Sequence, residues 1–255
     1  MLQKKSNRAP ATTMPLIELN NITKVFKVPH EQRRSVKENL ASILRPRTYE
    51  QFKAVDNVSF SVSPGEFISL IGPNGCGKST LLKIIAGIYQ PTGGELTVRD
   101  RISPFLELGV GFNYDLTARE NIFLYGAILG LSRREINEKF DDIVRFSELE
   151  RFIDTRLRNF SSGMYVRLAF ATAIQSDAPI LLFDEVLAVG DERFQQKCFA
   201  LFEKMKQQEK TIVFVSHDLR SIERFSDRVI LMDRGRKVME GPPQVVVSAY
   251  RSRIG

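Results

Sequence analysis

The sequence predicts an α/β fold, in which buried strands alternate with helices, and two features support this prediction. An apolar strand over residues 66–71 runs directly into a glycine-rich loop, and apolar side chains at helical spacing follow over 79–88. Two later apolar runs, over 179–183 and 211–215, have the length and composition of strands that are covered on both faces. Strands of this kind are typical of a mostly parallel sheet with helices packed against it.

The remaining elements follow in chain order. Short strands are expected over 16–19 and 58–62, the second because apolar and polar residues alternate there. Residues 117–157 carry long amphipathic helical stretches and few strand signals, which predicts a mostly helical subdomain. Near the end of the chain, a hairpin is expected over 229–240 and a last helix over 244–253.

These elements divide the chain into four parts. Residues 1–15 carry basic residues without the apolar centre of a secretory signal, so we expect a short disordered tail. The sheet-bearing core comprises 16–104 and, after an interruption, 177–255. The helical subdomain between them spans 105–176, which makes the core discontinuous in sequence.

Composition narrows the class of protein. The chain has 255 residues, enough for a substantial core, and its longest apolar stretches fall far short of the roughly 18 residues that a membrane-spanning helix needs. Its two cysteines, Cys76 and Cys198, are too few for a disulfide framework and favour a reducing compartment. The net charge of +7 suits nucleic acid, an anionic membrane or a polyphosphate ligand equally well. No run of like charges and no Cys/His pairing supports the nucleic-acid alternative further.

A basic segment over 31–53 interrupts the first two strands. Ser35 and Glu38 have the spacing of a capping box, an apolar stripe follows, and Pro46 ends the pattern, so an amphipathic helix is expected over about 35–46. A surface helix that packs its stripe on its own domain explains this pattern as well as a membrane or partner contact does. The basic residues of the segment are Arg33, Arg34, Lys37, Arg45, Arg47 and Lys53.

The glycine-rich loop after the strand over 66–71 matches the phosphate-loop pattern. Small residues at these positions let successive backbone N–H groups surround phosphate oxygens at the start of a helix. Lys78 is placed to reach the β- and γ-phosphates of ATP, and the Ser79 hydroxyl is placed to bind Mg²⁺. Cys76 is expected to be a small loop residue and not a reactive thiol. The loop comprises Gly72, Pro73, Asn74, Gly75, Cys76, Gly77, Lys78, Ser79 and Thr80.

An acidic pair ends the buried strand over 180–184. Asp184 is placed to hold Mg²⁺ through water, and Glu185 is placed to act as the general base for the attacking water. Alone, Asp-Glu after a strand is an ordinary beginning of a loop. Together with a phosphate loop, the pair predicts hydrolysis of a nucleoside triphosphate.

A third motif, Phe-Ser-Ser-Gly-Met over 160–164, opens a helix with hydroxyl groups and backbone N–H groups. The order of phosphate loop, helical insert, this motif, acidic strand and the downstream Ser-His-Asp over 216–218 resembles the nucleotide-binding subunits of ABC transporters, from about residue 16 to 245. The resemblance implies a P-loop NTPase (RecA-like) core with an antiparallel β subdomain and an inserted helical subdomain. It also implies a head-to-tail homodimer, in which Ser161, Ser162 and Gly163 of one subunit complete the ATP site of the other.

The same resemblance implies roles for four single residues. His217 corresponds to the histidine that contacts the γ-phosphate and holds Glu185 and the water in place. Asp191 corresponds to the aspartate of a loop at the dimer interface. Phe26 stands where the family places an aromatic ring on adenine, although it suits a core position equally well. Residues 105–121 lack the family's metal-sensing glutamine, and Glu107 is the nearest candidate, but a carboxylate accepts hydrogen bonds without donating any.

The family's usual signature Leu-Ser-Gly-Gly-Gln appears here as Phe-Ser-Ser-Gly-Met. Together with this signature, Glu-Leu-Gly-Val-Gly-Phe over 107–112, Glu-Val-Leu-Ala-Val-Gly-Asp over 185–191 and the basic segment resemble the Wzt/TagH group of bacterial exporters of polysaccharides such as O-antigen and teichoic acid. That likeness implies a peripheral ATPase on the cytoplasmic face of the inner membrane, bound to two copies of an integral-membrane permease. The lipid-linked glycan would then be driven across the membrane, and arginines of the basic segment could attract its lipid diphosphate.

Two other functions remain open at this point. A soluble ABC ATPase that acts on nucleic acid or ribosomes would suit the basic charge, but such proteins usually carry two ATPase cores or a long coiled coil, so no nucleic-acid partner is expected. The ATPase of a nutrient importer is a nearer alternative, and the missing glutamine and the basic segment argue against it.

Overall fold

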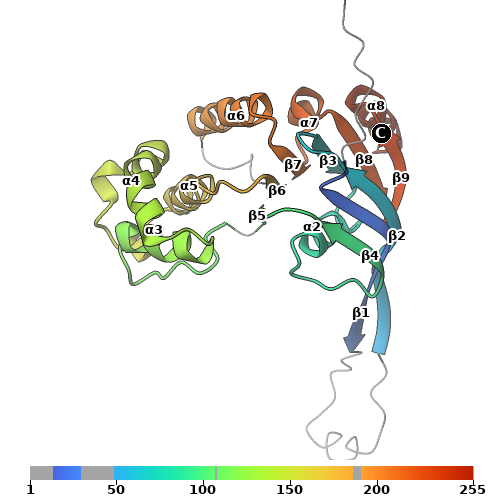
Figure 1. The fold of residues 1–255 in the computed structure, drawn as a ribbon, viewed down its shortest axis with the longest axis horizontal. Helices are drawn as coiled ribbons and strands as arrows, with labels where there is room; N and C mark the ends of the chain where they lie inside the picture. The colour runs from blue at the N-terminus through green and yellow to red at the C-terminus, as the bar shows by residue number, and fades with distance from the viewer. Residues whose placement is uncertain (1–13, 30–48, 107, 186–190, 255) are drawn as a thin grey trace, which may run out of the picture.

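The computed structural model describes residues 14–29, 49–106, 108–185 and 191–254. Its strands lie at one end of the molecule, and a lobe of helices lies at the other (Figure 1). The predicted α/β class is confirmed. The subdomain boundaries stay predictions, and the predicted helix over 35–46 lies outside the described residues.

A three-stranded antiparallel sheet has the order β2-β1-β4, formed by β1 (Ile17–Pro29), β2 (Tyr49–Val62) and β4 (Gly93–Val98). The expected strands over 16–19 and 58–62 are therefore far too short, and residues 49–53 of the expected basic segment belong to β2. The reason is that β1 pairs with β4 only as far as Thr23, so beyond that point β1 and β2 form a two-stranded ribbon outside the sheet. Most of that ribbon is at least partly exposed and lacks the apolar alternation of a core strand.

The larger sheet has the order β5-β6-β7-β3-β8-β9, and all its strands are parallel except the last. In this order β3 lies beside β7, and β7 lies beside β6, so the carboxyl ends of these three strands meet at one edge. Ligands of open α/β sheets bind outside this edge. The strands are β3 (Phe67–Ile71), β5 (Ile102–Phe105), β6 (Ile180–Asp184), β7 (Thr211–Val215), β8 (Arg228–Asp233) and β9 (Arg236–Gly241).

One face of the larger sheet packs on α2 (Lys78–Ile85), which lies between the two sheets. Four apolar side chains of α2 are almost fully buried there, and Ile68 and Leu70 of β3 meet them from the sheet. Because β3 side chains alternate between faces, Phe67 and Ile71 enter the opposite core. Both faces of β3 are thus covered, which explains its continuous apolar run.

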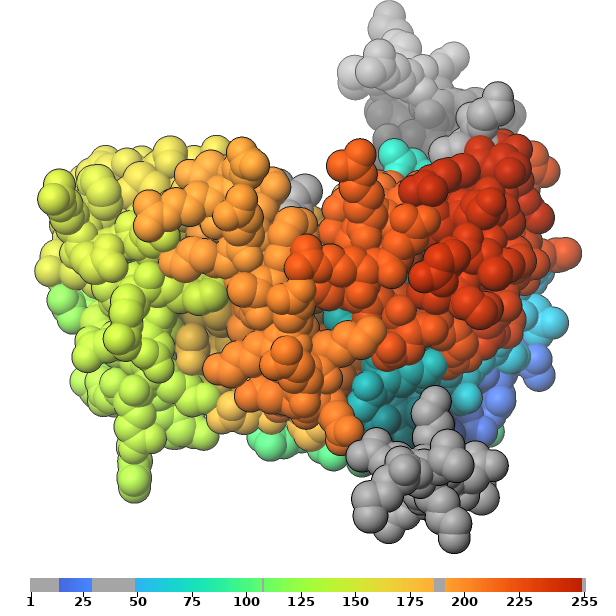
Figure 2. Space-filling model, turned by 90° about the horizontal axis from the view of Figure 1, so that it is seen from above, coloured from blue at the N-terminus to red at the C-terminus, as the bar shows by residue number. Residues whose placement is uncertain are grey.

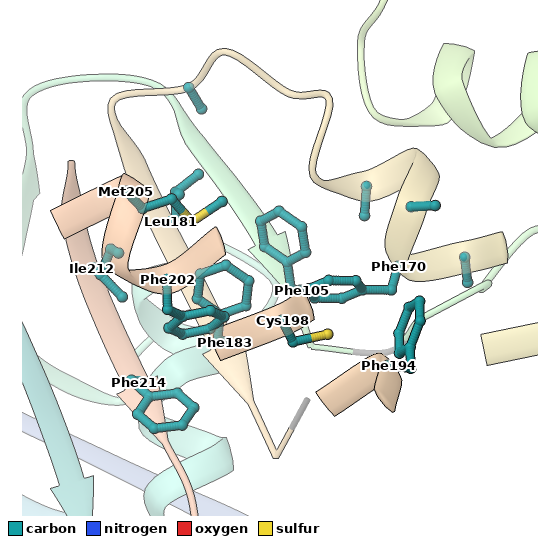
Figure 3. Packing of buried hydrophobic residues seen from close by; sticks show 14 of the residues in the cluster. Phe105, Phe170, Leu181, Phe183, Phe194, Cys198, Phe202, Met205, Ile212 and Phe214 are labelled. Atoms are coloured by element: carbon teal, nitrogen blue, oxygen red, sulfur yellow. The ribbon is translucent and has the colours of Figure 1, made fainter. Parts of the chain in front are cut away.

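The opposite face packs against α6 (Glu192–Gln207), α7 (Leu219–Phe225) and α8 (Pro243–Ile254). A cluster of phenylalanines fills this core (Figure 3): the Phe183 ring lies 4.3 Å from that of Phe105 and 4.7 Å from that of Phe202. At the other end of α6, the Phe194 ring lies 6.1 Å from that of Phe170 on α5 (Ser162–Ala173) of the helical lobe. Helix α6 therefore packs on both lobes, and Figure 2 shows it between the helical lobe and α7 and α8.

The helical lobe contains α3 (Ala118–Ile128), α4 (Arg133–Ser147) and α5 (Ser162–Ala173), with short 3₁₀ turns at Glu150–Phe152 and Leu157–Asn159. Capping boxes begin two of these helices, with Thr117 and Glu120 at α3 and Ser132 and Glu135 at α4. Each box satisfies backbone N–H groups that the first turn leaves unpaired. Within the described part of the chain, no helix is both long and apolar enough to cross a membrane.

Candidate functional site

The glycine-rich loop connects β3 to α2 and approaches other backbone closely. A Cβ on Gly72 would lie 2.1 Å from the Met232 carbonyl oxygen, and one on Gly77 would lie 2.3 Å from the Ala54 carbonyl oxygen. Both glycines also have positive φ angles, of 146° and 103°. The loop therefore has its shape because no side chain stands at these two positions.

Lys78, the first residue of α2, is 5% exposed, and its ammonium group lies inside the loop. Its Nζ donates hydrogen bonds to the carbonyl oxygens of Gly72 at 2.8 Å and Pro73 at 2.9 Å. The unpaired N–H groups at the start of α2 add to this positive charge, and no acidic residue stands in the first turn to oppose it. The loop can therefore hold a phosphate group.

The other loop residues differ in exposure. Ser79 is exposed, Thr80 is partly buried and Cys76 is 3% exposed. Burial raises the pKa of the Cys76 thiol, and the nearby Lys78 ammonium only partly opposes this effect. A thiol with a raised pKa stays protonated and is a poor nucleophile.

Asp184 lies at the carboxyl end of β6, and its Oδ1 is buried without a hydrogen-bond partner among the described residues. Burial raises the pKa of this carboxyl group, while a hydrogen bond from Ser79 opposes the rise. A buried acceptor without a partner is rare in folded proteins and points to a bound group. The Asp184 carboxylate lies beside the Ser79 hydroxyl, and together the two groups offer oxygen ligands of the kind that Mg²⁺ prefers.

These two oxygens do not form a complete metal site. Among the described residues, no group of three or more His, Cys, Asp or Glu side chains could hold a metal ion. Mg²⁺ is usually bound by one or two protein groups together with waters and substrate phosphates. The residues present therefore fit Mg²⁺ that arrives with a nucleotide.

Glu185 and His217 meet at the same edge of the sheet. His217 Nε2 lies 2.7 Å from Glu185 Oε1, and both side chains are about half exposed. Glu185 has a φ angle of 56°, which is uncommon for a residue with a side chain, and its N–H donates to the Val215 carbonyl oxygen at 2.9 Å. The left-handed turn after β6 thus sets the direction of the Glu185 carboxylate, and the strand order brings the histidine to it.

The Ser-Ser-Gly segment begins α5. Ser161 is the N-cap and accepts a hydrogen bond from the Met164 N–H at 3.2 Å, while Ser162 is exposed. Helix α5 packs against α3 and α4, whereas α2 packs between the sheets, so the Ser-Ser-Gly segment and the glycine-rich loop belong to different lobes. The structure does not bring Gly163 and the phosphate loop together within one chain.

Asp191 is the N-cap of α6 and accepts a hydrogen bond from the Phe194 N–H at 2.9 Å. Its other oxygen pairs with Arg167 of α5 at 2.6 Å. The backbone hydrogen bond and the guanidinium group lower the pKa of Asp191. Its predicted place at a dimer interface stays a prediction. Sequence reasoning missed Arg167, because its carboxylate partners Glu148 and Asp191 lie 19 and 24 residues from it in the chain.

Phe26 lies on β1 as a partly buried ring. It contacts Tyr89 edge to face, with ring centroids 5.5 Å apart, and the Lys24 ammonium lies 5.2 Å from its centre. The predicted contact of Phe26 with adenine stays a prediction. Glu107, the candidate for the family's glutamine, lies outside the described residues.

Tyr165 is a further residue that the sequence motifs did not indicate. Its hydroxyl donates to the Gly109 carbonyl oxygen at 2.9 Å, and its ring stacks on that of Tyr114 at 5.7 Å. Burial and the neighbouring Tyr114 raise the pKa of Tyr165 to about 12. Through this residue, α5 is attached to the chain that leaves β5.

Comparisons with known proteins show the family to which the chain is similar. The family described as "ABC transporter" matches residues 55–188. The chain is 40% identical over 246 residues to the O-antigen export system ATP-binding protein RfbB of Klebsiella pneumoniae, covering 94% of this chain and 99% of that protein. It is 39% identical to the teichoic acids export ATP-binding protein TagH of Lactiplantibacillus plantarum, covering 92% of this chain and 64% of that protein.

A solved structure has the same fold. The ATP-binding cassette MJ0796, in a dimeric post-hydrolysis state bound to ADP and Pi, superposes with a TM-score of 0.71. The two sequences are 27% identical, and the match covers 89% of this chain and 98% of that one.

Proposed function

The chain belongs to the ABC transporter family, and from that premise we propose that it is the ATP-hydrolysing subunit of an ABC exporter. Its cargo is a lipid-linked polysaccharide of the O-antigen, capsule or teichoic acid type. The contact that carries the catalytic part of this proposal is the 2.7 Å pair of Glu185 and His217, which lies beyond the same sheet edge as the phosphate loop.

Each group at this edge has a part in hydrolysis. The loop amides and Lys78 bind and orient the β- and γ-phosphates, and Glu185 accepts a proton from the water that attacks the γ-phosphate. His217 holds the Glu185 carboxylate in position through its Nε2. Ser79 and Asp184 would hold Mg²⁺, which supplies positive charge to the phosphate oxygens.

A dimer would complete the site. The start of α5 carries exposed hydroxyl groups in one lobe, and the phosphate loop lies in the other, so neither has its counterpart within its own chain. In a head-to-tail pair, Ser161, Ser162 and Gly163 of one subunit would face the nucleotide held by the other. The dimeric state of MJ0796 with ADP and Pi supports this arrangement.

The transport partner and cargo are inferred from the relatives. Proteins about 40% identical to this chain are named as ATP-binding components of O-antigen and teichoic acid export. The chain would bind two copies of an integral-membrane permease as a peripheral subunit on the cytoplasmic face of the inner membrane. Basic residues of the 31–53 segment, such as Arg33 and Arg34, would attract the lipid diphosphate of the glycan.

Glu185→Gln tests the hydrolytic part. The amide cannot accept the proton, so we expect turnover to fall by roughly 10²–10⁴-fold, the range for loss of a general base, with ATP binding retained. Steady-state phosphate release and titration with a fluorescent ATP analogue measure the two quantities. Glu138→Gln, which removes an exposed carboxylate paired with Arg134, is the matched control. Turnover near the wild-type rate in the Glu185 variant would refute the base assignment.

Purification from membranes tests the transport part. Co-purification with an integral-membrane partner supports export, whereas co-purification that nuclease abolishes supports action on nucleic acid. Reversing the charge of Arg33 and Arg34 should slow glycan export more than ATP hydrolysis. An equal loss of both would contradict a role for these residues in attracting the cargo.

A further inference from the structure

Arg167 joins three helices. It lies on α5, and its side chain is only 18% exposed. Its Nη2 donates to Asp191 Oδ2 at 2.6 Å, and its Nη1 donates to Glu148 Oε2 at 3.4 Å. The guanidinium carbon also lies 5.2 Å from the centre of the Phe194 ring on α6. The guanidinium group thus contacts the first turn of α6 and the residue that ends α4.

Both carboxylates are themselves held in place. Asp191 caps α6 by accepting the Phe194 N–H at 2.9 Å. Glu148 has a φ angle of 58° after the last turn of α4, and its Oε1 accepts from Lys197 at 3.0 Å. Hydrogen bonds from Lys197 to Glu148 and from the Phe194 N–H to Asp191 are the main causes that lower the pKa values of these two groups. Arg167 therefore lies between two fixed negative charges.

The pair connects two functional segments. Ser162 begins α5, whose first turn would face the ATP of the partner subunit, and Arg167 follows it by five residues. Asp191 stands six residues after Glu185, which would hydrolyse the ATP bound to its own subunit. We propose that Arg167 is a positioning residue: by holding Asp191, it fixes α5 against the start of α6, so that the start of α5 and the start of α6 move together. This inference rests on the proposed ATPase function.

The chemistry of the contact requires arginine. A planar guanidinium group presents several N–H donors in a fixed fork and can reach two carboxylates at once, whereas a lysine ammonium is a single point of charge. The Asp191 side chain is 62% exposed. Ion pairs with such exposure add little to folding stability, so loss of the contact should change position more than folding.

A double-variant cycle tests the proposal. Arg167→Gln and Asp191→Asn are made singly and together; asparagine keeps the ability to cap α6. We expect each single change to lower turnover at least tenfold, the double change to lower it no further, and the ATP Kd to stay within twofold. Arg167→Lys should recover part of the turnover. The exposed pair of Arg119 and Asp154, 2.8 Å apart in the helical lobe, is the matched control, and its cycle should leave turnover within twofold.

Each other outcome would overturn the proposal. If the two losses multiply, or if Asp191→Asn loses turnover while Arg167→Gln retains it, the two residues act separately. A wild-type chain that binds no fluorescent ATP analogue refutes the proposed function itself. That result differs from multiplied losses with ATP binding intact, which refute the positioning role alone.

Discussion

Asp184 is a carboxylate of the site whose folded environment opposes its own charge. Its pKa is raised from the ordinary value of 3.8, first by burial and then by the neighbouring Glu185, against the opposing effects of Ser79, Lys78 and Lys83. A carboxyl group with a raised folded pKa destabilises the fold at pH values above that pKa, where it must be charged. This cost disappears as the pH falls below the ordinary value. Function therefore retains a residue here that stability alone would replace.

Asp184→Asn should raise the Tm of the nucleotide-free chain at pH 7, because the neutral amide avoids the burial of a charge. In a chain of this size, the Tm should rise by about 2–4 °C for each kcal/mol that the substitution adds to the free energy of unfolding. The difference from wild type should shrink as the pH falls through the raised pKa toward 3.8 and below, because the wild-type carboxyl then takes up its proton in the folded chain. Thermal unfolding at several pH values measures it, with exposed Asp154→Asn as control. A lower Tm at pH 7 would contradict the burial argument.

At the scale of elements, helix α5 is held on two sides. Tyr165 attaches it to the chain that leaves β5, through the Gly109 carbonyl oxygen, and Arg167 attaches it to the start of α6. Residues two positions apart on a helix point to nearly opposite sides, so the two contacts fix α5 from both directions. The helix that carries the Ser-Ser-Gly segment is thus held both by the segment at Gly109 and by the start of α6 at Asp191.

Gly109→Ala should destabilise the chain more than Gly130→Ala does. Both glycines have φ angles near +80°, so each alanine should cost roughly 1–2 kcal/mol in the left-handed region. A Cβ on Gly109 would also lie 2.7 Å from the Tyr165 ring, whereas nothing lies within 4 Å of one on Gly130. The clash should lower the free energy of unfolding of Gly109→Ala by about a further 1–3 kcal/mol. Unfolding in urea measures both variants, and equal losses would show that Tyr165 does not restrict this loop.

At the scale of the whole molecule, α6 packs on both lobes. Phe202, near one of its ends, contacts Phe183 of the larger sheet, and Phe194, near the other, contacts Phe170 of α5. In the dimer that we propose, the two lobes also meet between chains: each ATP would need the phosphate loop of one subunit and the start of α5 of the other.

Mixing two inactive variants tests this arrangement. In a head-to-tail dimer of one Lys78→Ala chain and one Ser162→Arg chain, one site carries both changes and the other carries neither. An equal mixture should therefore recover roughly a quarter of the wild-type sites if the chains pair at random. Phosphate release measures the recovery. If each site belonged to a single chain, the mixture would stay as inactive as its components. As a control, mixing Lys78→Ala with a chain that carries both changes should recover nothing.

The local features of this protein could be predicted from short stretches of its sequence. The glycine spacing of the phosphate loop, the apolar runs of β3, β6 and β7, and the acidic pair at Asp184 and Glu185 could be found because each depends on residues that are adjacent in the chain. Strands covered on both faces have nearly continuous apolar runs. The tertiary structure decided what depends on distant partners. It extended β1 and β2 into a ribbon, because pairing between strands holds residues with no apolar pattern of their own. It also set the 2.7 Å distance between His217 and Glu185, a pairing that the family resemblance had implied, and brought Arg167 to Asp191, which no motif had indicated. Strand order and helix packing, not spacing in the chain, set those distances.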